Sequence, residues 1–134
     1  NMMKIAIKRV LFFVLTISLV TSCAFSFNVN VNDSILEGKW VSNTIYDPND
    51  PYSTRQAYKD ETYMFDNLGN FQYYYKSRLS FSGTYTYNDL NGIMVLTDGR
   101  DTEFVQVVDV DNSTLILDYS DQYGALYVEF YKRY

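Results

Sequence analysis

Apolar and polar residues alternate over most of the chain after Ser34, and no stretch there has a convincing helical period. Successive side chains of a β-strand point to opposite faces of the sheet, so strict alternation is typical of a strand with one buried face. Turn-forming residues separate the alternating segments. The pattern predicts eight strands, at residues 38–46, 60–66, 71–78, 79–87, 93–97, 102–110, 114–119 and 125–134.

Most of the predicted connections are short, as in Asn67-Leu68-Gly69-Asn70 and Asp98-Gly99-Arg100-Asp101. Short connections favour an all-β, up-and-down antiparallel meander, and closure into an eight-stranded barrel removes exposed sheet edges. The exceptions are a long loop at 47–59 and a capping-box pattern at 34–37, which predicts a short helical turn. The residues predicted to point inward are Phe71, Tyr73, Tyr75, Phe81, Gly83, Tyr85, Leu115, Leu117, Leu126, Val128 and Phe130.

The first 22 residues have a different pattern, with three basic residues and then an uncharged, mostly apolar run at 10–20. A run of this length predicts a signal-peptide helix, because a span of the bilayer needs about 20 residues. The run ends in Val20-Thr21-Ser22-Cys23, which resembles the lipobox of bacterial lipoproteins. The resemblance implies cleavage before Cys23, a diacylglycerol thioether on its sulfur, and acylation of the new N-terminus with a chain such as palmitate. The alternatives are a free buried cysteine or an ordinary secretory signal.

These patterns divide the chain into a signal peptide (1–22), a lipidated N-terminus with its tether (23–34) and a β-barrel domain (35–134). The alternating segment after Cys23 could instead pair as an edge strand. Two or three acyl chains anchor a protein stably, whereas one does not. We therefore expect a monomeric protein of the cell envelope, held by its lipid at the outer membrane.

Composition narrows the possible functions. The chain has 14 Tyr and 9 Phe but no His, and Cys23 is its one cysteine. The part from Cys23 onward holds 8 basic and 16 acidic residues, a formal charge of −8, so a nucleic-acid partner is not expected. Without histidine, and with Cys23 acylated, the usual nucleophilic triads and most zinc sites are excluded. We expect no enzyme, cofactor or metal site, and the acid-rich segments are interpreted as ordinary turns.

Three motifs in order resemble lipocalin-like lipoproteins of Bacteroidetes: Gly38-Lys39-Trp40, the hairpin at 63–71, and Gly83-Thr84-Tyr85-Thr86. The resemblance implies an eight-stranded barrel whose Trp40 packs across the closed end. A basic residue near the chain end would stack on this tryptophan. Lys132 and Arg133 are the candidates, and Arg133 is preferred because a planar guanidinium stacks well on indole. Gly38, Trp40 and Arg133 are thus interpreted as structural residues of the barrel floor.

Two function classes remain. The first is a non-catalytic binding module that holds a small apolar or amphipathic ligand inside the barrel. The second is a protein- or glycan-interaction module, for example a hydrolase inhibitor, with a barrel filled by its own side chains. A ligand would enter opposite Trp40, where the long loop lies. The predicted ligand-binding residues are Tyr52, Arg55 and Tyr58 of this loop, with Tyr73, Tyr75 and Tyr85 of the inner face.

Overall fold

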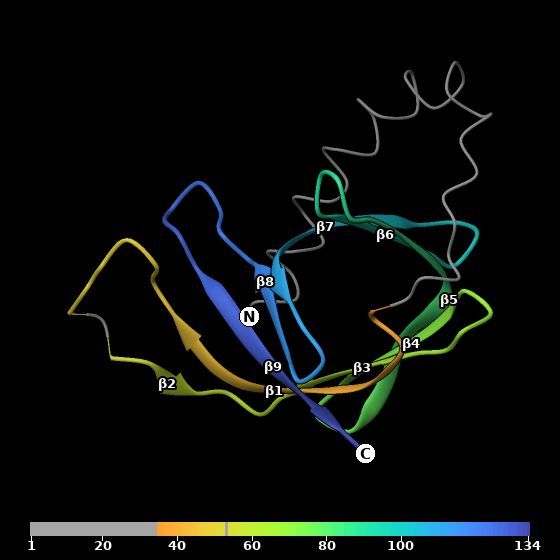
Figure 1. Ribbon diagram of the computed structural model, residues 1–134, viewed down its shortest axis with the longest axis horizontal. Helices are drawn as coiled ribbons and strands as arrows, with labels where there is room; N and C mark the ends of the chain where they lie inside the picture. Colours follow the sequence, from red (N-terminus) through yellow and green to blue (C-terminus); the bar gives the residue numbers. More distant parts are fainter. Residues whose placement is uncertain (1–34, 53) are drawn as a thin grey trace.

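The computed structural model describes residues 35–52 and 54–134, and nine β-strands lie in this part of the chain (Figure 1). The predicted boundaries are accurate to a few residues, because each strand ends where its alternation meets a turn. The strands are β1 (Gly38–Tyr46), β2 (Gln56–Ala57), β3 (Glu61–Phe65), β4 (Asn70–Tyr75), β5 (Arg78–Asn88), β6 (Ile93–Thr97), β7 (Thr102–Val110), β8 (Thr114–Asp118) and β9 (Tyr127–Arg133).

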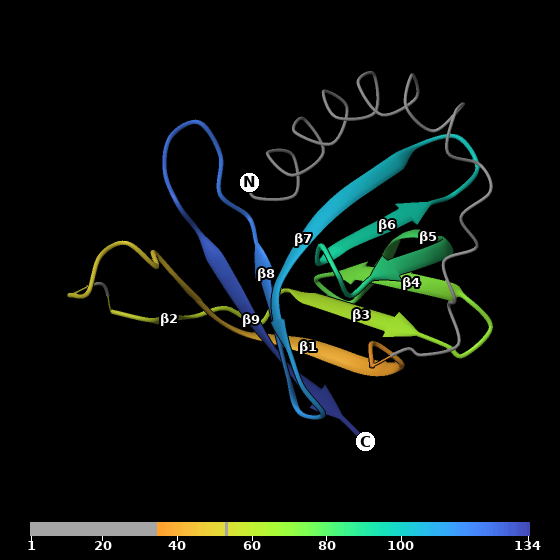
Figure 2. The same cartoon turned by 45° about the horizontal axis from the view of Figure 1, so that its top comes forward.

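Eight of these strands form a closed antiparallel barrel, which confirms the predicted architecture. Neighbours in the sheet follow the order β1-β3-β4-β5-β6-β7-β8-β9, and β9 pairs back onto β1. Figure 2 shows β1, β3, β4, β5 and β6 side by side in this order in the barrel wall. The short strand β2 was not predicted. It lies within the loop expected at 47–59 and pairs with the end of β1, at Thr44↔Ala57 and Ile45↔Gln56.

Two local features of the backbone need separate mention: the turn between β4 and β5, and the segment before β1. Tyr75 pairs with Arg78, so β4 and β5 are joined by Lys76 and Ser77 alone, both with positive φ (49° and 67°). Two consecutive left-handed residues form the hairpin turn that matches strand twist. Near Ser34, the predicted helical turn is not found in the described residues: Ile35 and Leu36 form a turn without a helix. The Leu36 carbonyl instead accepts a hydrogen bond from Trp40 Nε1 (2.7 Å), which draws this segment into the barrel.

The barrel interior is lined by the residues whose alternation predicted it. Phe71, Tyr73, Tyr85 and the four aliphatic or aromatic residues at 115, 117, 128 and 130 are buried, and Tyr75, Phe81 and Leu126 pack partly against them. The core also contains residues not singled out from the sequence: Leu36, Tyr63, Phe65, Met94, Leu96, Val107 and Tyr119. Those of them that lie in strands are on the side of their strand that faces the barrel interior.

Antiparallel connections give the barrel two distinct ends. The Trp40 end contains the start of β1 and the turns at 66–69, 89–92 and 111–113. The far end contains the end of β1, the start of β3 and the connections at 47–60, 76–77, 98–101 and 119–126. The 47–60 connection and the 119–126 loop extend to the same side, at the left of Figures 1 and 2. No helix among the described residues has the length and apolar character needed to cross a membrane.

Candidate functional site

The Trp40 end is closed by packing and by a cation. Trp40 is fully buried, and Lys132 Nζ lies 5.3 Å from the centre of its ring. Arg133, the residue preferred from the sequence, is exposed and pairs with Lys39. This preference was wrong because directly opposite residues share a face of the sheet, and Trp40 is opposite Lys132. Arg133 therefore lies on the outer face.

Gly38 gives the lysine room to reach the tryptophan. Its φ is +127°, which other residues rarely adopt, and a Cβ here would lie 2.5 Å from Lys132 Cε. Gly38 and Trp40 are two residues apart on the same strand, so both face the lysine stem. The motif Gly38-Lys39-Trp40 is therefore a structural device that closes this end of the barrel, as its resemblance implied.

The inner face at the far end carries a buried carboxylate held by tyrosines. Glu61, the first residue of β3, is 2% exposed. Its Oε1 accepts hydrogen bonds from the hydroxyls of Tyr73 on β4 (2.5 Å) and Tyr119 after β8 (2.7 Å). Its backbone N–H donates to Ser42 Oγ on β1 (3.0 Å). Residues from separate walls of the barrel therefore converge on one carboxyl group.

The second oxygen of Glu61 has no hydrogen-bond partner among the described residues, although it is buried. Burial raises the pKa of Glu61, and the phenol hydroxyls of Tyr73, Tyr119 and Tyr58 oppose this shift only in part. The phenol of Tyr58 lies nearby, and its pKa is raised by burial and then by the charge of Glu61. A buried oxygen without a donor costs free energy, which a ligand with an N–H or O–H group would recover.

A second interior carboxyl group lies at the same end. Glu103 on β7 is opposite the fully buried Leu96 of β6, so its side chain faces inward. Burial raises the pKa of Glu103 to about 7, and the charges of Glu61 and Asp101 add to this shift. The pKa values of both carboxyl groups are thus raised, and neither group has a salt-bridge partner among the described residues.

Partly exposed apolar side chains lie at the same end of the barrel as these acids. They pack against the core yet keep some contact with solvent, and they come from β1, β4, β5 and the two longest connections: Ile45, Tyr58, Tyr75, Phe81 and Leu126. We call these five residues the apolar rim. The far end therefore combines a polar centre with an apolar margin, whereas the rest of the interior is filled by aromatic contacts such as Tyr63–Phe130 and Phe65–Tyr85.

Three of the six predicted ligand-binding residues meet at this centre. Tyr73 donates to Glu61, Tyr75 is opposite Glu61 in the β3–β4 ladder, and Tyr58 lies beside the same carboxylate. The other three lie elsewhere. Tyr52 is 92% exposed, and Tyr85 donates to the Asp66 carbonyl at the Trp40 end.

Arg55 belongs to the outer wall of the barrel. Its guanidinium lies 4.1 Å from the centre of the Tyr46 ring and forms a salt bridge with Glu129 (3.1 Å). Glu129 lies between the inward residues Val128 and Phe130 of β9, so its side chain faces outward. These contacts hold the β2 segment against β1 and β9.

Sequence reasoning missed Glu61, Glu103 and Tyr119. The first two have a detectable signal, because each is an acid in the inward phase of its strand: Glu61 with Tyr63 and Phe65, and Glu103 with Val105 and Val107. The inward positions of a half-buried strand are normally apolar, so an acidic residue at such a position is unexpected. Tyr119 lies just past the end of β8, where alternation no longer indicates its direction.

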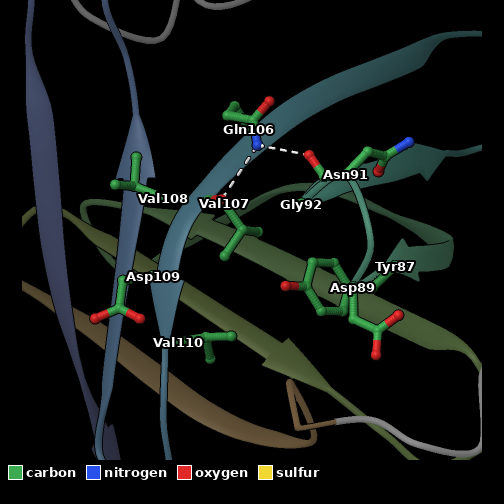
Figure 3. Close-up of a pocket in the computed structure, with 9 residues that line it drawn as sticks. All are labelled: Tyr87, Asp89, Asn91, Gly92, Gln106, Val107, Val108, Asp109 and Val110. Carbon is green, nitrogen blue, oxygen red and sulfur yellow. Dashed lines mark hydrogen bonds between the residues drawn. The ribbon is translucent and has the colours of Figure 1, made fainter.

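A separate hollow of about 370 Å³ lies on the surface near the Trp40 end (Figure 3). Its walls are the β5–β6 turn and the later part of β7, including Tyr87, Asp89 and Asp109. Gln106 Nε2 donates to the carbonyls of Asn91 (3.0 Å) and Val107 (3.2 Å) and so ties the two walls together. None of the predicted site residues lines this hollow, and we interpret it as a consequence of the bulge in β7 between Val107 and Asp109.

Comparisons with known proteins agree with this architecture. The model of the lipocalin-like domain family matches residues 36–117, more than half of the chain. The chain belongs to the lipocalin-like domain family. A solved lipocalin-like protein from Bacteroides uniformis is similar over 75% of this chain and 100% of its own, with 17% identity and a TM-score of 0.53. That likeness concerns the fold alone, and no curated protein matches.

Two further expectations from the sequence concern metal binding and the N-terminal segment. Within the described residues, no group of three or more Asp, Glu, His or Cys residues is placed to hold a metal ion. Cys23 and the tether at 23–34 lie outside the residues that the structure describes, as does the signal peptide at 1–22.

Proposed function

We propose that this lipocalin-like chain is a non-catalytic, lipid-anchored binding protein of the cell envelope that takes a small amphipathic ligand at the far end of its barrel. The observation that carries the proposal is the buried Oε2 of Glu61, which lies at the same end as the apolar rim and has no hydrogen-bond partner among the described residues. Barrels of eight strands are wide enough to be filled by side chains or to hold one small ligand.

The distribution of side chains supports binding at this end and not at the other. At the Trp40 end, the buried Trp40 side chain donates a hydrogen bond to Leu36 and is covered by Lys132. The far end keeps five apolar side chains in partial contact with solvent. Apolar surface with a few convergent polar groups is the usual composition of a small-molecule site. The absence of histidine from the sequence supports a binding role over the common forms of acid–base catalysis.

The binding proposal is tested by calorimetric titration of the full chain in phospholipid nanodiscs with octanol, using empty nanodiscs as the blank. We expect saturable binding to the parent chain. The Leu126→Trp variant places a larger side chain in the apolar rim and should lose binding. The matched control is Leu90→Trp, because Leu90 is 93% exposed in the turn at the Trp40 end. Equal binding by both variants, or no binding by the parent, would contradict the proposal.

The anchor is tested separately through Cys23. The lipobox resemblance supports a thioether on this residue, the one cysteine of the chain. We expect the parent chain to incorporate labelled palmitate and to partition with the membrane fraction of a bacterial host. Cys23→Ser should incorporate no label and should accumulate unprocessed or soluble. A processed Cys23→Ser protein that still partitions fully with membranes would show that the lipid is not the anchor.

A further inference from the structure

We propose that the ligand of the far end is an amphipathic organic amine, whose protonated nitrogen donates to Glu61 Oε2 and whose apolar body lies against the rim. This inference rests on the proposed binding function and adds the chemical class of the ligand. It starts from the geometry of Glu61, whose Oε1 accepts from Tyr73 and Tyr119, while Oε2 has no donor at hydrogen-bond distance among the described residues, although the Tyr58 phenol is near. The vacant position therefore requires a group that donates.

The surroundings of Oε2 favour a positively charged donor over a neutral one. Glu61 and Glu103 bring two carboxyl groups to the same end of the interior, and the charge of Glu61 raises the pKa of Glu103. Three of the basic side chains near this end have other partners: Arg55 bonds Glu129, Lys59 bonds Asn43, and Lys76 lies over the Tyr75 ring. A bound cation would supply the opposite charge that the buried acids lack.

The tyrosines at this end add a second attraction for a cation. Tyr58, Tyr73 and Tyr119 surround the carboxyl group, and Tyr75 pairs across from it on β4. The negative face of an aromatic ring attracts an ammonium group, most strongly where water is excluded. An alkyl chain on the same ligand would cover the partly exposed side chains of Ile45, Phe81 and Leu126. The charge of the chain from Cys23 onward, −8, also attracts a cation.

The test compares four ligands with a main chain of eight carbons, using the full protein in nanodiscs: octylamine, octanol, octanoate and octyltrimethylammonium. We expect octylamine to bind at least about tenfold more tightly than octanol, because a charge-assisted hydrogen bond is stronger than a neutral one. Octanoate should bind most weakly. Octyltrimethylammonium carries the charge without an N–H group, so it should bind more weakly than octylamine if Oε2 is the acceptor.

Two matched variants assign the effect to Glu61. Glu61→Gln keeps the size of the side chain and an acceptor for Tyr73 and Tyr119 but removes the charge, so octylamine affinity should fall to about that of octanol. Glu129→Gln neutralises another buried glutamate, on the outer wall, and should leave the affinity unchanged. Octanol binding to Glu61→Gln should persist, which shows that the variant is folded.

Failure of this inference differs from failure of the proposed function. If octanol binds while octylamine binds no more tightly, the amine inference is overturned and the binding function stands. The same conclusion follows if Glu61→Gln retains the full preference for octylamine. If neither octanol nor octylamine binds the parent chain, the binding function itself is overturned.

Discussion

At the scale of the residue, two glycines and one lysine show how closely the backbone and side chains of this barrel are packed. Gly83 on β5 lies against the backbone of the β6–β7 turn, and a Cβ there would lie 1.9 Å from the Thr97 carbonyl oxygen. Gly38 lies under the stem of Lys132. In both cases the missing side chain is what permits the contact, so the glycine is required by a neighbour as much as by its own conformation.

Gly83→Ala should therefore be strongly destabilising. The nearest atoms are backbone and cannot rotate away, so β5 must separate from the turn, at a cost of about 2–3 kcal/mol in the free energy of unfolding. Urea unfolding followed by tyrosine and tryptophan fluorescence measures this cost. Gly99→Ala is the matched control, since nothing lies within 4 Å of a Cβ there and only its φ of +94° opposes the change. Equal losses in both variants would contradict the steric explanation.

Lys132→Ala and Arg133→Ala should differ although the residues are adjacent. Lys132 covers Trp40 with its stem and its ammonium group, and the loss of both should cost about 1–2 kcal/mol. Arg133 is exposed on the outer face, so its replacement should change stability by less than about 0.5 kcal/mol. Thermal or urea unfolding distinguishes the two. A larger loss for Arg133→Ala would restore the arginine as the partner of Trp40.

At the scale of the element, the turns are stabilised by their own aspartates. Asp66 Oδ1 accepts from the N–H groups of Leu68 and Asn70, and Asp98 Oδ1 accepts from those of Arg100 and Asp101. Asp111 makes the same contacts with the two residues that follow Asn112. These hydrogen bonds lower the pKa of each of the three aspartates. The acid-rich segments are thus turn structures, as the sequence indicated.

The turn between β4 and β5 is the exception, because it has no glycine or aspartate at its centre. Lys76 and Ser77 both adopt the left-handed conformation, which costs roughly 1–2 kcal/mol for a residue with a Cβ. Ser77→Gly should relieve part of this cost and raise the free energy of unfolding by about 0.5–1 kcal/mol. Urea unfolding measures the gain, with Ser80→Gly, which is in β5, as a control expected to lose stability. A destabilised Ser77→Gly variant would contradict the turn geometry.

At the scale of the whole molecule, the barrel interior contains two acidic side chains, Glu61 and Glu103, both in the half away from Trp40. Unfolded glutamate titrates near pH 4.3, whereas the pKa of Glu103 is about 7 in the folded barrel and that of Glu61 is also raised. Between these pH values the folded chain holds protons that the unfolded chain has released. The free energy of unfolding should therefore fall as pH rises from about 5 to 8, by roughly 3 kcal/mol for Glu103.

Urea unfolding at pH 5 and pH 8 tests this dependence. The three turn aspartates act in the opposite direction, but only below about pH 4, so they do not contribute within this interval. Glu103→Gln should flatten the pH dependence, because an amide is neutral at both values. Glu129→Gln, on the outer wall, should leave it as in the parent chain. A parent chain that is more stable at pH 8 than at pH 5 would contradict the buried position of Glu103.

The sequence by itself determined the strands, the barrel and much of the inner face, because these depend on local quantities: a period of two, turn residues and strand length. It also located Tyr58 in the loop opposite Trp40, from the order of the connections, and Tyr73 and Tyr75 on the inner face, from the alternation. Only the tertiary structure decided that Lys132, and not Arg133, covers Trp40, because that choice depends on the register of β9 against β1.

The chemistry of the far end was also decided by the tertiary structure. Glu61 and Tyr119 are 58 residues apart, and the hydrogen bond between them exists only because the barrel closes. Arg55 was predicted to bind ligand from the long loop together with Tyr52 and Tyr58, yet it pairs with the outward-facing Glu129 on the outer side of the barrel wall. Alternation specifies which residues share a face of one strand. Which residues from different strands meet, and which buried oxygen is left without a partner, depends on closure and register over the whole sheet.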